Sequence, residues 1–231
     1  MIAISEIFGP TIQGEGSLIG TPTVFVRTGG CDYRCSWCDT MHAVDKKYKD
    51  EWLAMSASEV FQQVETLSGG KPILITLSGG NPAIQDLSEL IRLGKAKGYR
   101  FAMETQGSVS APWFAELDYL TLSPKPPSSK MRFDQIRFDT TLHNAQDINV
   151  SLKIVVADDA DLEWAAEIKQ QYPQLPLYLQ PCNLELEGNP SLDSLTTKTL
   201  NLVEEVMQRG WFDATVLPQL HVYLWGNEKG V

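Results

Sequence analysis

Three of the four cysteines, Cys31, Cys35 and Cys38, lie within eight residues in a C-x3-C-x2-C pattern. Thiolates bind soft metals, and iron–sulfur clusters are held by cysteines. A four-iron cluster held by three thiolates keeps one open coordination position, which distinguishes a reactive metal site from a structural one. The spacing alone leaves two alternatives open: a zinc site completed by His42 or Cys182, and three incidental thiols. A lone cysteine such as Cys182 is more often a small buried hydrophobe than a ligand.

Alternating elements surround this loop. Short apolar runs predict strands at residues 23–28, 72–77, 100–104, 119–122, 150–156, 177–180 and, before the tail, 215–217. Amphipathic stretches predict helices at about 56–67, 85–97, 158–171 and 196–208. Strand–helix alternation at this spacing favours a parallel sheet with crossover helices.

The fold class expected is α/β, a distorted partial βα barrel with about six parallel strands and fewer helices. The chain has 231 residues, which is short for a complete eight-fold barrel of ~250 residues. Ligands bind such sheets at the carboxyl ends of the strands. The unusual motifs follow strands, so we expect them to meet at that end. We expect one domain over 1–231, with a cluster loop at 29–41 and a C-terminal tail, 218–231, that closes the active site.

Composition narrows the class of protein. Hydrophobic residues make up 43% and charged residues 21%, which is typical of a globular chain. The formal net charge of −10 argues against a general nucleic-acid binder, which needs a positive field. No apolar run approaches the ~20 residues of a membrane span, and the first residues lack a signal-peptide pattern. Cysteines that cluster instead of spreading argue against a secreted disulfide framework, so we expect a cytoplasmic protein.

A second motif, Gly79-Gly80-Asn81-Pro82, follows the strand after the cysteine loop. Together with C-x3-C-x2-C it resembles the radical S-adenosylmethionine (SAM) superfamily, whose members usually have a glutamate where Asn81 stands. The resemblance implies a 4Fe-4S cluster on the three cysteines. Its open iron chelates SAM, and one electron then cleaves the sulfonium to give a 5′-deoxyadenosyl radical.

The resemblance narrows to the 7-carboxy-7-deazaguanine synthase family and covers nearly the whole chain. It is carried by the opening segment 6–16, by residues 25–27, 38–40, 78–82, 104–107 and 123–127, and by the tail motifs 217–221 and 224–226. The resemblance implies a lyase that converts 6-carboxy-5,6,7,8-tetrahydropterin to 7-carboxy-7-deazaguanine and ammonia by radical ring contraction. This reaction belongs to deazapurine (queuosine) biosynthesis, uses SAM catalytically and requires Mg²⁺.

The family match also implies site residues, with no protein acid or base assigned. Thr40 offers a hard oxygen for Mg²⁺. The residues expected beside SAM are Trp37, Cys38, Asp39, Gly80, Ser123, Pro124, Lys125, Gln180 and Asn183. Those expected beside substrate are Ile12, Gln13, Gly14, Glu15, Arg27, Ser78, His221 and Val231. Arg27 can pair bidentately with the substrate carboxylate, and His221 is a second expected contact to that group.

Two rival functions remain open at this point. One is a radical SAM activase that makes a glycyl radical on a partner protein, and the other is a non-catalytic zinc or Fe-S electron-transfer module. The family resemblance further implies a homodimer, a reductant protein such as flavodoxin, and a small pterin substrate, with no nucleic-acid or membrane partner. No role follows from the sequence for His42 or His143.

Overall fold

The computed structural model describes residues 1–185, 188 and 190–231. A nine-stranded sheet runs through the molecule in the order β3-β1-β2-β4-β5-β6-β7-β8-β9. The strands are β1 (Ile2–Ile12), β2 (Pro22–Thr28), β3 (Leu53–Met55), β4 (Leu74–Gly79), β5 (Arg100–Thr105), β6 (Tyr119–Leu122), β7 (Asn149–Val156), β8 (Leu177–Pro181) and β9 (Ala214–Val216). The helices are α1 (Met41–Val44), α2 (Ala57–Leu67), α3 (Ser88–Lys95), α4 (Gln135–Asn144), α5 (Asp159–Gln171), α6 (Leu192–Gln208) and α7 (Leu220–Trp225).

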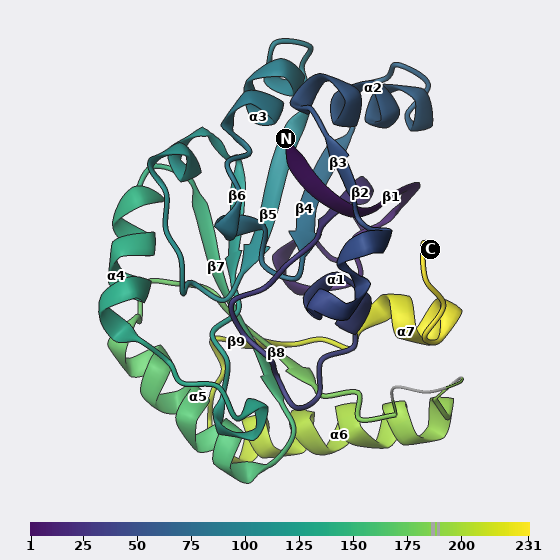
Figure 1. Ribbon diagram of the computed structural model, residues 1–231. Helices are drawn as coiled ribbons and strands as arrows, with labels where there is room; N and C mark the ends of the chain where they lie inside the picture. Colours follow the sequence, from purple (N-terminus) through teal and green to yellow (C-terminus); the bar gives the residue numbers. More distant parts are fainter. Residues whose placement is uncertain (186–187, 189) are drawn as a thin grey trace.

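The sheet is parallel from β2 through β9, and β1 joins it antiparallel to β2 and β3. Its two edge strands, β3 and β9, do not pair, so the curved sheet stays open (Figure 1). The expected partial barrel is therefore confirmed. The short strand expected at 215–217 is present as β9, which brings the parallel strands to seven.

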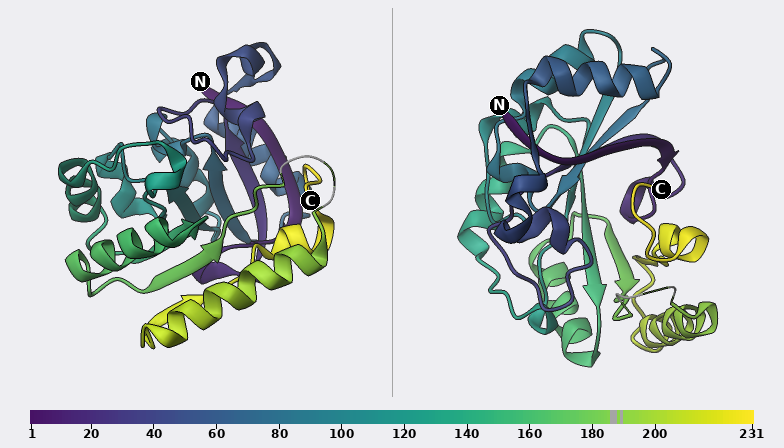
Figure 2. Two further views of the ribbon diagram at one scale, coloured as in Figure 1. Left: turned by 90° about the horizontal axis from the view of Figure 1, so that it is seen from below. Right: turned by 45° about the vertical axis from the view of Figure 1, so that its right-hand side comes forward.

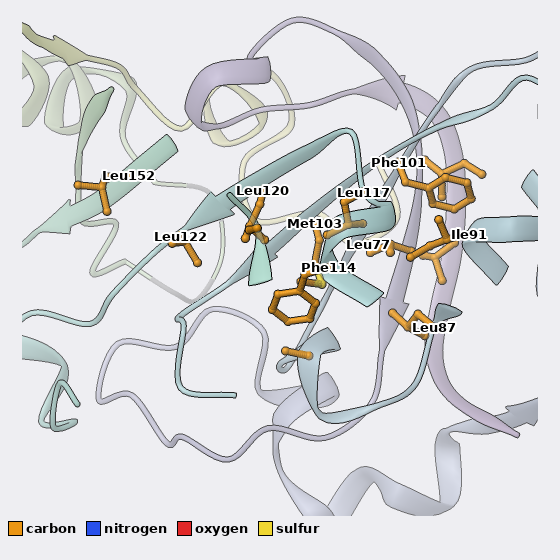
Figure 3. Close-up of a cluster of buried hydrophobic side chains, with 14 of the residues drawn as sticks. Leu77, Leu87, Ile91, Phe101, Met103, Phe114, Leu117, Leu120, Leu122 and Leu152 are labelled. Atoms are coloured by element: carbon orange, nitrogen blue, oxygen red, sulfur yellow. The ribbon is translucent and has the colours of Figure 1, made fainter. Parts of the chain in front are cut away.

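Helices cover the convex face of the sheet (Figure 1). Every second residue of the parallel strands points to this face, as the two-residue period of a strand requires. Leu77, Met103 and Leu122 lie there with α3 residues such as Ile91 in one apolar cluster (Figure 3). Burying this cluster is the main term that stabilises the domain.

Several elements differ from the sequence predictions. The capping box at Ser56 and Glu59 begins α2 as expected. The strand β1 was missed, because Gly9 and Pro10 interrupt it, and the pairing with β2 shifts register between Phe8 and Thr11. The helices α1, α4 and α7 and the strand β3 were also missed, and α6 begins at Leu192 with Ser191 as its cap, ahead of the predicted start.

Candidate active site

The concave face of the sheet carries the other half of each strand's residues, and it lines a cavity. Phe25 and Arg27 on β2 face this side, as do Thr76 and Ser78 on β4. Glu104 on β5, Lys153 on β7 and Val155 on β7 complete the strand contribution. The same period of two that buries the apolar core therefore delivers the polar side chains to one cavity of about 230 Å³.

One end of the cavity is formed by the cysteine loop. Cys31, Cys35 and Cys38 all line it and are half-buried. Burial raises the pKa of the Cys38 thiol to about 11, and Asp39 and the other two thiols add to this. A metal that binds here must therefore displace protons from the thiols, as thiolate ligation always requires.

The loop is held in place by the segment that follows β6. The Ser36 amide donates to the Ser129 carbonyl (3.0 Å), and the Trp37 indole donates to Ser128 Oγ (2.9 Å). The Lys125 ammonium lies 5.8 Å from the centre of the Trp37 ring. The Pro-rich stretch 125–131 is thus a formed loop, and it fixes the cysteine loop from one side.

The glycine motif after β4 supports the loop from the other side. A Cβ on Gly80 would lie 2.1 Å from the Gly30 carbonyl oxygen, so only glycine allows this approach. The backbone N–H of Asn81 donates to that same Gly30 carbonyl (2.8 Å). The Asn81 side chain is buried, donates to Asp32 (2.8 Å) and accepts from Thr105 (2.8 Å). Asparagine at this position therefore anchors the first turn of the cysteine loop.

A second group of residues in the cavity lining is charged, and we call it the charged end: Glu15, Glu104, Lys153 and their partner Gln219. Lys153 pairs with both Glu15 and Glu104, and Gln219 donates to the remaining oxygen of Glu15 (2.8 Å). Burial alone would raise the pKa of Glu15, but the charge of Lys153, aided by His221 and by hydrogen bonds, holds it well below its usual range. Glu15 is therefore ionised at neutral pH.

Arg27 on β2 lines the same cavity. Its Nε donates to Glu6 Oε1 (2.5 Å), and its guanidinium lies 5.7 Å from the centre of the Phe8 ring. His42 Nε2 is 3.3 Å from the same Glu6 oxygen, so this histidine, for which the sequence predicted no role, contacts the partner of Arg27. Glu6 and Phe8 thus fix the guanidinium plane. Its terminal nitrogens have no hydrogen-bond partner in the part of the chain that the structure describes, so they can bind an anionic ligand in the cavity.

The C-terminal segment covers this charged end, with α7 beside the end of β1 (Figure 2). The Leu220 amide donates to the Gly14 carbonyl (2.9 Å), and the Asn183 side chain donates to Asn227 (3.0 Å). Val231 itself lines the cavity. That the tail closes the active site stays a prediction.

The structure brings nearly all of the predicted site residues to this one cavity. Those that line it are Ile12, Gln13, Gly14, Glu15, Arg27, Cys31, Cys35, Trp37, Cys38, Asp39, Thr40, Ser78, Gly80, Ser123, Lys125, Asn183, His221 and Val231. Pro124 and Gln180 do not line it; Gln180 is buried beside it and donates to the Pro218 carbonyl (3.0 Å), which ties down the tail. Their roles toward SAM stay predictions.

Sequence reasoning missed several cavity residues. Phe8, Tyr33, Gln106 and Gln219 belong to segments that carry the family motifs, but no single residue stood out. Lys153 had a signal, because a lysine inside an otherwise apolar strand needs an ionic partner. The buried Ser78 Oγ has no hydrogen-bond partner among the described residues, so it is left for a ligand.

The donor set fits an iron–sulfur cluster. Within the described ranges, no three His, Cys, Asp or Glu side chains converge as the ligands of a single metal ion do. The three thiols instead surround part of a cavity, as a cluster several ångströms across requires. Cys182 follows β8 and lines the same cavity, and burial, with Asp39 and Asp161, raises the pKa of its thiol.

Comparisons with known proteins agree with this geometry. Residues 25–140 match the family model of the radical SAM superfamily. The chain is 44% identical to 7-carboxy-7-deazaguanine synthase of Bacillus subtilis, with 100% of this chain and 98% of the relative covered. It is 40% identical to the enzyme of that name from Bacillus cereus, with 100% and 99% covered.

The chain belongs to the 7-carboxy-7-deazaguanine synthase family. A crystal structure of QueE from Escherichia coli shares the fold, with a TM-score of 0.67 and 24% identity over 95% of this chain and 94% of that chain. As a radical SAM enzyme of this family, a lyase, the protein has a 4Fe-4S cluster and SAM as its cofactors. The zinc site and the electron-transfer module are thereby set aside.

In the described part of the chain, no helix is long and apolar enough to cross a membrane.

Proposed function

We propose that the protein converts 6-carboxy-5,6,7,8-tetrahydropterin to 7-carboxy-7-deazaguanine with release of ammonia. The observation that carries this proposal is that one cavity is lined by the three loop thiols, by Arg27 and by the ion pairs of Lys153 with Glu15 and Glu104. A pterin carboxylate matches the guanidinium, and the N–H groups of the pterin ring match the buried carboxylates. The sequence relatives named above support the same reaction.

When bound, the cluster and SAM supply a 5′-deoxyadenosyl radical that abstracts hydrogen from the substrate. The work of this chain is to hold the two partners in place. Cys31, Cys35 and Cys38 would hold the cluster, while Gly80, Ser123 and Lys125, which line the same cavity, would bind SAM. The tail over the charged end excludes water, which protects a radical from side reactions.

Thr40 is the proposed Mg²⁺ ligand, with the substrate carboxylate and waters completing the octahedral shell. Its hydroxyl lines the cavity directly after the cysteine loop and donates to Asp39 Oδ1 (2.6 Å). A metal ion here would share the cavity with Arg27. Both would then bind the substrate carboxylate and fix the pterin.

The electron donor is proposed to be a flavodoxin, and the enzyme a cytoplasmic homodimer. The whole chain is acidic, but Arg34, Lys130 and Arg132 are exposed where the cysteine loop meets the 127–133 segment. This local basic group is where an acidic donor can approach the cluster. The four cysteines are free, as in a reducing compartment.

An anaerobic turnover assay tests the proposed function. Reconstituted protein is mixed with SAM, dithionite, Mg²⁺ and the carboxytetrahydropterin, and 7-carboxy-7-deazaguanine is measured by mass spectrometry. The proposal predicts product, with SAM regenerated. Formation of 5′-deoxyadenosine without product would refute the substrate and favour the glycyl-radical activase.

A further inference from the structure

Lys153 is the most deeply buried charged side chain of the cavity. It stands in the middle of β7, and only 3% of its side chain is exposed. Its two carboxylate partners come from far along the chain: Glu15 follows β1, and Glu104 is on β5. An isolated lysine would lose its charge in such a place, so a carboxylate partner is needed to keep it.

The charges around Lys153 do not balance. Two carboxylates face one ammonium, and His221 on α7 is the other titratable group nearby, with Nδ1 4.0 Å from Glu15 Oε1. Both oxygens of Glu15 are engaged, by Lys153 and by Gln219. Glu104 is the more exposed carboxylate at 28%, and among the described residues its Oε2 has no protein partner. The excess negative charge therefore faces the cavity through Glu104.

We propose that Lys153 is a positioning residue that fixes Glu104 and Glu15 as ionised acceptors, with Glu104 receiving the N–H donors of the substrate's amino-pyrimidine edge. The inference rests on the proposed function, because that edge belongs to the pterin. The proposal adds Glu104 and Lys153 to the site residues predicted from the sequence. It also identifies Lys153 as the residue that holds the carboxylate of Glu15.

Lys153 is needed because a carboxylate can accept hydrogen bonds from N–H groups with both oxygens only while it is ionised. Two carboxylates that share a buried site without a cation retain a proton between them. A protonated carboxyl would then direct an O–H at the N–H groups of the ligand. Burial alone would lower the pKa of Lys153, yet Glu104 and Glu15 raise it above its ordinary value, so the ammonium persists at all working pH values.

The test compares Lys153→Met with Lys97→Met in the holoenzyme. Methionine keeps most of the volume of the lysine stem and removes the charge. Lys97 also pairs with a glutamate, Glu65, but it lies at the surface away from the cavity. For each variant, KM for the pterin and kcat are measured well below the melting temperature. The electron paramagnetic resonance (EPR) change of the reduced cluster on SAM addition is recorded as a readout of the thiol end.

We expect Lys153→Met to raise KM about 10- to 100-fold, as the loss of a charge-assisted contact does, with a smaller change in kcat and an unchanged SAM response. Lys97→Met should keep all three values of the wild type. A folded Lys153→Met protein with the wild-type KM would overturn the proposal. So would a uniform fall in kcat together with loss of the SAM response, which is what a general structural defect produces.

If Lys153→Met does not fold, Glu104→Gln replaces it in the same assay. This variant leaves the Lys153–Glu15 pair intact with balanced charge and changes only the proposed acceptor. A raised KM with an intact SAM response is expected, and an unchanged KM would overturn the proposal. Turnover by the wild type distinguishes a failure of this proposal from a failure of the proposed function. If the wild type forms no product, the pterin is the wrong substrate, and the contact between Glu104 and its amino-pyrimidine edge is refuted as well.

Discussion

The two ends of the cavity are built in opposite ways. The thiol end comes from one short loop, in which Cys31 and Cys38 are separated by six residues, and soft sulfur ligands dominate it. The charged end is assembled from β5, β7, the loop after β1 and the tail; Lys153 and Glu15 are 138 residues apart, and Gln219 and Glu15 are 204 apart. One end holds a cofactor locally, whereas the other exists only when the whole sheet has folded.

This difference predicts two kinds of failure. A change at the thiol end removes the cluster and leaves the charged end formed. A change at the charged end weakens binding of the substrate or loosens the fold and leaves the cluster in place. The following substitutions test that division, beginning with the largest effect.

Cys35→Ala is expected to abolish product formation, because two thiolates do not hold the cluster that supplies the chemistry. Iron and sulfide contents should fall, and the reduced protein should show no EPR change with SAM. Cys182→Ala is the matched control: it removes a thiol at the cavity wall and should keep the iron content of the wild type. Full cluster content in Cys35→Ala would contradict the ligand assignment.

Arg27→Met is expected to lower kcat/KM about 100-fold, which corresponds to about 3 kcal/mol for a lost charged pair with the substrate carboxylate. Arg27→Lys should lose less, because it keeps the charge but not the bidentate geometry. Steady-state kinetics with saturating SAM measures both. Equal losses in the two variants would argue against a bidentate contact.

Gly14→Ala is expected to loosen the tail. An added Cβ would lie 2.4 Å from His221 Nδ1 and 2.9 Å from the His221 backbone nitrogen, so the segment must shift, at a cost of about 1–3 kcal/mol. Limited proteolysis should then cleave the tail faster, and KM for the pterin should rise about tenfold. An unchanged cleavage rate would show that the tail adapts without opening.

Acid should weaken the charged end first. The folded-state pKa of Glu15 lies below its unfolded value of ~4.3, so its stabilising contribution is present above that pH and is lost as pH falls toward its folded pKa. Denaturant unfolding of the cluster-free protein should show a falling free energy of unfolding below about pH 4.5. The fall should be shallower in Lys153→Met; parallel curves would mean that Lys153 does not lower this pKa.

The same contrast explains what the sequence could predict. The cysteine loop, the seven parallel strands and the helices α2, α3, α5 and α6 follow local rules, namely ligand spacing, apolar periodicity and the Ser56 cap, so they were found. The strand β1 was missed because Gly9 and Pro10 break the local pattern, and only pairing with β2 reveals it. The Lys153 triad was missed because its partners are brought together by sheet order, which no local spacing encodes.

The account holds that SAM binding at the thiol end is independent of the residues that bind the substrate. One anaerobic experiment on the wild type and Arg27→Met tests this most directly. Both proteins are reduced, and the EPR spectrum is recorded before and after SAM is added, followed by assay of 7-carboxy-7-deazaguanine. The account predicts the same SAM-induced change in both proteins, with product formed readily only by the wild type. Loss of the SAM response in Arg27→Met, or undiminished product formation by it, would contradict the account.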